Sequence, residues 1–161
     1  MNWCQTTGTC VATALAMSLF SGSSAGQQKS LRDQLVGTWT LVSHQSVSMY
    51  GANPNGVAFF DAGGRFIITV IRSDRAKYAT NHPAKGTDEE NRATAQGAMT
   101  YFGTYTVNEA DRSIAIHIEA SSFPNWSGTD QTRIVAIEGD RLTLTARALG
   151  GSADVVWQRA K

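Results

Sequence analysis

Cysteine is almost missing from this chain: among its 161 residues only Cys4 and Cys10 carry a thiol, and both lie near the N-terminus. The rest of the chain therefore cannot build a disulfide framework, a Cys-x-x-Cys redox pair or a thiolate metal site. The three histidines, His44, His82 and His117, follow no metal-binding spacing, so we expect no metal. The sequence also lacks a Gly-x-Ser-x-Gly nucleophile motif and a phosphate-binding glycine loop, and we expect no cofactor.

An excess of charge of either sign is also absent. Lys and Arg number 14 against 13 Asp and Glu, which gives a net charge of +1, and the basic residues are scattered along the chain. Nucleic acids and anionic membrane surfaces attract clustered positive charge. We therefore expect neither of them as a partner.

Charged side chains are missing altogether before Lys29. Residues 11–20 form an apolar run of the length found in signal peptides, which is too short to span a membrane. Ser23, Ser24 and Ala25 then supply the small residues that precede a cleavage site. The pattern predicts a signal peptide over residues 1–25, with export to the periplasm or the medium and no stable membrane insertion. The alternative to a signal peptide is a helical or disordered tail. The remaining chain is predicted to form one domain over residues 30–161.

Short runs of β-forming residues, separated by turn residues, fill the chain from residue 35 onward. Glycines in the turns at 62–64 and 139–140 favour tight hairpins, and Leu142, Leu144 and Ala146 alternate with polar residues as in a half-buried strand. The predicted strands are 37–47, 56–61, 65–72, 101–108, 112–120, 132–138, 141–147 and 154–159. This pattern predicts an all-β, eight-stranded antiparallel up-and-down barrel.

One short helix in a long connection interrupts the predicted strands. Thr87 and Glu90 have the spacing of a capping box, and residues 88–99 are rich in helix-forming residues. The preceding polar stretch, residues 73–86, is predicted to be a long loop beside the mouth of the barrel, either as a lid or without a role.

A resemblance to a known family rests on Gly37-x-Trp39, the signature that opens the first strand of lipocalins, and on Arg159 near the end of the chain. Further matching segments are 35–43, 50–51, 53–54, 56, 63–66, 101–107, 122–126, 128–131, 139–142 and 157–159. With them the chain resembles the lipocalin-like domain family of short bacterial and fungal barrels in the calycin superfamily. The resemblance implies an eight-stranded barrel without an agreed ligand or reaction. It also implies that Gly37 lets the chain turn into the first strand, that the Trp39 indole plugs the floor and that Arg159 lies across this ring.

The candidate site comprises six polar or aromatic side chains from three successive segments of the chain, each on a predicted strand or directly before it. They are Tyr101, Tyr105, His117, Glu119, Gln131 and Arg133. Residues two apart share one face of a strand, so all six could point into the barrel and orient a polar ligand or transfer protons. The alternative is that Ile114, Ile116 and Ile118 face inward, which would leave His117 and Glu119 in solvent. Trp126, in the loop that follows, either covers a ligand or caps the barrel end.

The sequence therefore predicts an exported barrel that binds a small, mostly apolar molecule with a polar handle. The alternative is an enzyme of the isomerase or cyclase type, in which His117 or Glu119 is the base and Tyr105 or Arg133 stabilises developing charge. A third interpretation is a solid barrel with its function on the outer face. The sequence predicts neither the identity of the ligand nor the oligomeric state.

Overall fold

The computed structural model describes residues 29–148 and 151–161, together with Met1. Apart from Met1, the predicted signal peptide and both cysteines lie outside these residues. Export therefore stays a prediction.

Eight antiparallel strands form a closed barrel in which each strand pairs with the next along the chain and the last pairs with the first. The strands are β1 (Gly37–His44), β2 (Asn55–Phe60), β3 (Arg65–Ile71), β4 (Ala98–Asn108), β5 (Ser113–Ser121), β6 (Thr129–Glu138), β7 (Arg141–Ala148) and β8 (Gly151–Arg159). The helices are α1 (Leu31–Leu35), α2 (Val47–Tyr50) and α3 (Asp88–Gln96), with a 3-10 turn η1 (Pro124–Trp126). The predicted up-and-down barrel is confirmed.

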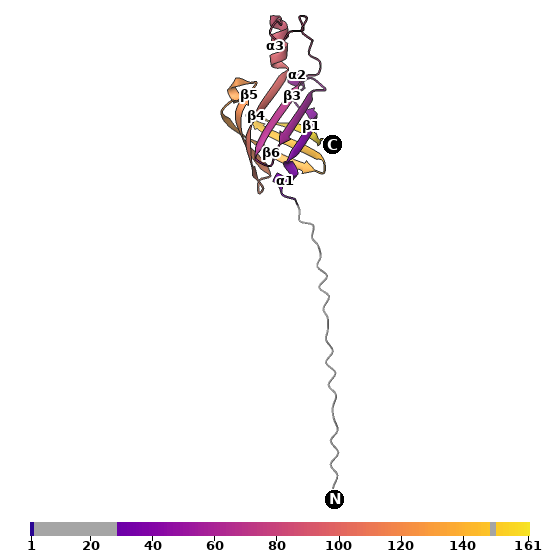
Figure 1. Ribbon diagram of the computed structural model, residues 1–161, viewed down its shortest axis with the longest axis vertical. Coiled ribbons are helices and arrows are strands. Elements are labelled where there is room, and N and C mark those ends of the chain that lie inside the picture. The colour runs from indigo at the N-terminus through magenta and orange to yellow at the C-terminus, as the bar shows by residue number, and fades with distance from the viewer. Residues whose placement is uncertain (2–28, 149–150) are drawn as a thin grey trace.

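The two ends of the barrel differ. Figure 1 shows α1 at one end, and α2 and α3 at the other. Since the strands alternate in direction, the short turns after β2, β4 and β6 lie at the end with α1, which we call the closed end. The longer connections, with α2, α3 and η1, lie at the other end, which we call the open end.

The closed end is filled by Trp39. Its side chain is fully buried, and its indole Nε1 donates to the Leu35 carbonyl over 2.8 Å. The guanidinium carbon of Arg159 lies 4.1 Å from the centre of the Trp39 ring, while its two terminal nitrogens donate to the carbonyls of Gln34 and Val36. Cation–π attraction and these hydrogen bonds hold the last strand against the start of the first.

Helix α1 covers the same end with two buried side chains, Leu31 and Leu35. The Glu109 carboxylate, in the turn after β4, accepts from the backbone amides of Leu31 at 2.8 Å and of Arg32 at 3.1 Å. A carboxylate at a helix N-terminus satisfies amides that otherwise lack partners and complements the helix dipole. This contact and the burial of both leucines stabilise a helix that is too short to persist alone.

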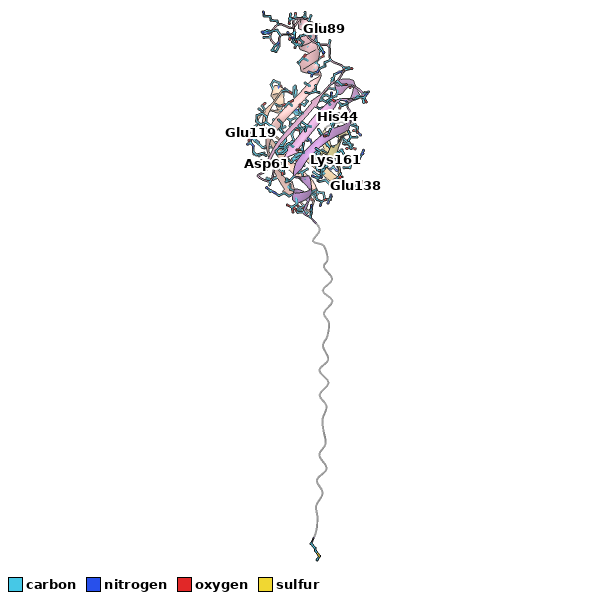
Figure 2. The ribbon with its side chains drawn as sticks, turned by 45° about the vertical axis from the view of Figure 1, so that its right-hand side comes forward. His44, Asp61, Glu89, Glu119, Glu138 and Lys161 are labelled. Carbon is cyan, nitrogen blue, oxygen red and sulfur yellow. The ribbon has the colours of Figure 1, made fainter. Side chains whose placement is uncertain are left out.

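Helix α3 begins with the predicted capping box. The Thr87 hydroxyl accepts from the Glu90 amide, and the Glu90 carboxylate accepts from the Thr87 amide. The helix ends at Gln96 and not at 99, because β4 already begins at Ala98, where it pairs with Ile71. None of its residues is buried, and Figure 2 shows Glu89 far from the barrel.

Gly103 lies where the pairing of β4 with β5 shifts by one residue. A Cβ at this position would collide with the His117 carbonyl oxygen. The close approach of the two backbones therefore requires glycine.

Candidate functional site

A cavity of about 240 Å³ occupies the barrel interior toward the open end. Its apolar lining is Met49, Ile68, Val70, Met99, Leu144, Ala146, Ala153 and Val155. Its aromatic and polar lining is His44, Ser46, Tyr50, Tyr101, Trp126, Arg133 and Trp157. A mostly apolar hollow with a few polar groups is typical of small-molecule sites.

Arg133 and Tyr101 are polar cavity residues that the sequence predicted. Arg133 on β6 is only 8% exposed, and its guanidinium donates to the Thr132 carbonyl and to the Gln131 side-chain oxygen. Tyr101 on β4 is also buried, and burial raises the pKa of its phenol, while the neighbouring Arg133 partly opposes this rise. The phenol is therefore neutral at physiological pH and lies beside a permanent positive charge.

His44 and Tyr50 are cavity residues that the sequence analysis missed. The rings lie edge to face with their centres 4.6 Å apart. His44 Nδ1 accepts from the Ser46 amide over 3.0 Å, and burial lowers the pKa of the imidazole. A register shift between Leu41 and Ser43 explains the miss, because a bulge moves the following side chains to the opposite face of the strand.

Aromatic rings line the cavity at both of its ends. Trp126 meets Tyr101 edge to face at 5.4 Å and meets Phe123 at 6.0 Å. Trp126 thus caps the open end and also lines the cavity, and its role of covering a ligand stays a prediction. Trp157 is fully buried toward the closed end, where it pairs with Leu142, and its Nε1 has no hydrogen-bond partner among the described residues.

A larger groove of about 870 Å³ lies outside the cavity, between α3, α2 and the Phe123–Pro124 segment. Met49 and Met99 line both spaces. The two methionines therefore separate the cavity from the groove. Methionine side chains are flexible, so these two are suited to let a ligand pass.

His117 and Glu119 lie on the outer wall of the barrel, so the prediction that they line the interior is wrong. His117 Nδ1 lies 2.7 Å from an Asp130 oxygen, and Glu119 forms an ion pair with Arg65 at 2.6 Å. Figure 2 shows Glu119 on the outside of the barrel. The physical reason is that the opposite face of β5 carries Ile114, Ile116 and Ile118, all buried, and burying three isoleucines is far more favourable than burying an imidazole and a carboxylate.

The enzyme alternative loses its named bases with this correction. An isomerase or cyclase that used His117 or Glu119 would need these groups beside the ligand, whereas both face away from the cavity.

Tyr105 and Gln131 also lie away from the cavity surface. Tyr105 is buried toward the closed end, where its hydroxyl donates to the Asp61 carbonyl over 2.6 Å and its ring packs on Phe60. Its predicted place in the cavity is therefore wrong, because Tyr105 lies four positions further along β4 than Tyr101, toward the closed end of the barrel. Gln131 shares the inward face of β6 with Arg133 and holds the guanidinium.

Within the described residues, no group of three or more His, Cys, Asp or Glu side chains is placed to hold a metal ion. In the same part of the chain, no helix has the length and apolar character needed to cross a membrane.

Comparison with known proteins identifies the family. The model of the lipocalin-like domain matches residues 36–160. The chain belongs to the lipocalin-like domain family. The matched range of this lipocalin-like domain contains all eight strands and every residue that lines the cavity.

A relative of this lipocalin-like domain is the 4'-hydroxy-3'-methoxypropiophenone carrier protein of Aspergillus oryzae, which is 34% identical over 82 residues. The alignment covers 47% of this chain and 74% of the relative. A solved lipocalin-like protein from Bacteroides uniformis is 16% identical with a TM-score of 0.44, over 79% of this chain and 99% of that one. As-p18, an extracellular fatty acid binding protein, is 14% identical with a TM-score of 0.42, over 82% of this chain and 100% of that one.

Proposed function

We propose that this lipocalin-like domain binds and carries a small, mostly apolar molecule with a polar handle. The observation that carries the proposal is the cavity itself, whose aliphatic wall is interrupted by the paired polar groups of Arg133 and Tyr101. The wall supplies affinity by excluding water from apolar surface, and the polar groups orient the ligand.

The size of the cavity limits the ligand. The volume of the cavity is about 240 Å³. Drug-sized molecules usually occupy pockets of roughly 300–1,000 Å³. A compact ligand, such as one aromatic ring with a short substituent, therefore fits better than a long acyl chain.

The aromatic lining suits a flat ligand. Tyr50, Trp126 and Trp157 can pack against a ring. The fungal relative is named as a carrier of a propiophenone, an aromatic ketone, which agrees with a ligand of this shape.

Isothermal titration with 4'-hydroxy-3'-methoxypropiophenone tests the proposal. We expect saturable binding with one site per chain. Ala153→Phe, which places a ring inside the cavity, should weaken it at least about 10-fold, a loss of ~1.4 kcal/mol. Ala136→Phe, on the exposed face of β6, is the matched control and should bind like the wild type. Equal binding by both variants would show that the ligand lies outside the cavity. The proposal is refuted if neither this ketone nor other compact aromatic compounds bind at all.

We further propose that the carrier works after export. The stretch without charged residues before Lys29, with its apolar run at 11–20, supports this proposal. Mass spectrometry of the protein secreted by an expressing host should find a chain that begins near residue 26. A full-length chain that stays inside the cell would contradict it.

A further inference from the structure

We infer that the polar handle of the ligand is an anion, a carboxylate or a similar planar oxyanion, that neutralises Arg133. The inference rests on the proposed binding function and adds to it the chemical class of the ligand.

The guanidinium of Arg133 is a buried charge whose described partners are all neutral. Its hydrogen bonds go to a backbone carbonyl, that of Thr132, and to the side-chain amide of Gln131. Arginine stays protonated in proteins, so burial cannot remove the charge. Buried charges are costly unless an opposite charge compensates them.

No carboxylate of the chain supplies this compensation. All 13 Asp and Glu side chains lie within the described residues, and none of them forms a salt bridge with Arg133 there. Neither carboxylate on β6 is placed to pair with Arg133. Asp130 pairs with His117 on the outer wall, and Glu138 is the last residue of the strand, at the closed end of the barrel. The opposite charge must therefore come from outside the chain.

The geometry of the site suits an oxyanion. Arginine has five N–H groups, and the two described hydrogen bonds use two of them, which leaves donors for a ligand oxygen. The adjacent Tyr101 phenol, whose pKa burial raises, stays protonated and adds a further donor without adding negative charge. Both side chains line the cavity.

The approach to the cavity carries no excess negative charge. The outer groove is lined by three basic residues and two acidic ones: Arg72, Arg75, Arg92, Asp74 and Glu89. Two of these three arginines are paired with the two carboxylates, so Arg75 is the one groove arginine for which the described residues provide no salt bridge. An anion can therefore reach the cavity without repulsion.

Titration with 4-propylbenzoate and 4-propylbenzamide at pH 7.5 tests the inference, because the two molecules have the same shape and differ by one charge. We expect the acid to bind wild-type protein at least about 10-fold more tightly than the amide, since hydrogen bonds to charged partners are the stronger ones. Arg133→Met should abolish the preference while keeping affinity for the amide. Arg141→Met, at an exposed position on β7, is the matched control and should keep it.

The comparison on the wild-type protein needs no variant, so the test survives if Arg133→Met fails to fold. Equal affinity for acid and amide would overturn the anionic handle and leave the proposed function standing. A preference that persists in folded Arg133→Met would overturn the assignment to Arg133. If neither compound binds, and uncharged propylbenzene does not bind either, the inference and the proposed function both fail.

Discussion

Ala146→Leu offers a direct thermodynamic test of the hollow interior. Ala146 on β7 pairs with Ala153 on β8, and both line the cavity. Leucine adds three carbons to this wall. If these enter empty apolar space, burial at ~0.8 kcal/mol per carbon contributes about 2.4 kcal/mol. Ordering the leucine side chain costs about 0.5–1 kcal/mol, so the free energy of unfolding should rise by roughly 1.5 kcal/mol.

Urea denaturation followed by tryptophan fluorescence measures this change. For a chain of this length, a gain of about 1.5 kcal/mol also corresponds to a rise in Tm of roughly 3–6 °C. Ala136→Leu on the outer face of β6 is the control and should change stability by less than about 0.5 kcal/mol. If Ala146→Leu instead destabilises the protein by about 1–3 kcal/mol, the cost of overpacking a filled core, the interior is not hollow at this position.

Four further outcomes are expected. Arg159→Ala removes a cation–π contact and two hydrogen bonds to carbonyls at the closed end, and should lower the free energy of unfolding by about 2–3 kcal/mol in urea denaturation. His117→Ala, on the outer wall, should change stability by less than about 1 kcal/mol and leave ligand affinity unchanged in calorimetric titration. Gly103→Ala should cost more than about 2 kcal/mol because its Cβ would collide with a carbonyl oxygen, so wild-type stability would disprove the close approach. Burial raises the pKa of Tyr50 and Tyr101, so the folded state keeps these two protons to higher pH than the unfolded state does. The free energy of unfolding should therefore be unaffected below pH 10 and then fall by up to about 1.4 kcal/mol per pH unit for each tyrosine. A free energy of unfolding that stays constant from pH 9.5 to 11 would contradict this expectation.

The barrel could be predicted from sequence because its signals are local. Alternation of apolar and polar residues, glycine-containing turns and the capping box at Thr87 each depend on a few neighbouring residues. The helices α1 and α2 lack such a signal, since five and four residues are too few for a helical period to show. The Glu109 carboxylate that caps α1 is 78 positions away from Leu31, a contact that only the closed barrel brings about.

The candidate site was predicted in part. Arg133, Tyr101 and Trp126 line the cavity as the sequence suggested, whereas the direction of His117 depended on which face of β5 is buried. The run of isoleucines on the other face already favoured the outward direction. His44 could not be found in this way, because an unpredictable bulge in β1 reverses the alternation just before it.

Nuclear Overhauser contacts between 4'-hydroxy-3'-methoxypropiophenone and methyl groups of the protein test the central claim most directly. We predict contacts from the bound ligand to Met99 and Val155, which line the cavity. Contacts confined to the exposed Val57 and Ile67 on the outer wall would place the ligand outside the barrel and contradict the account.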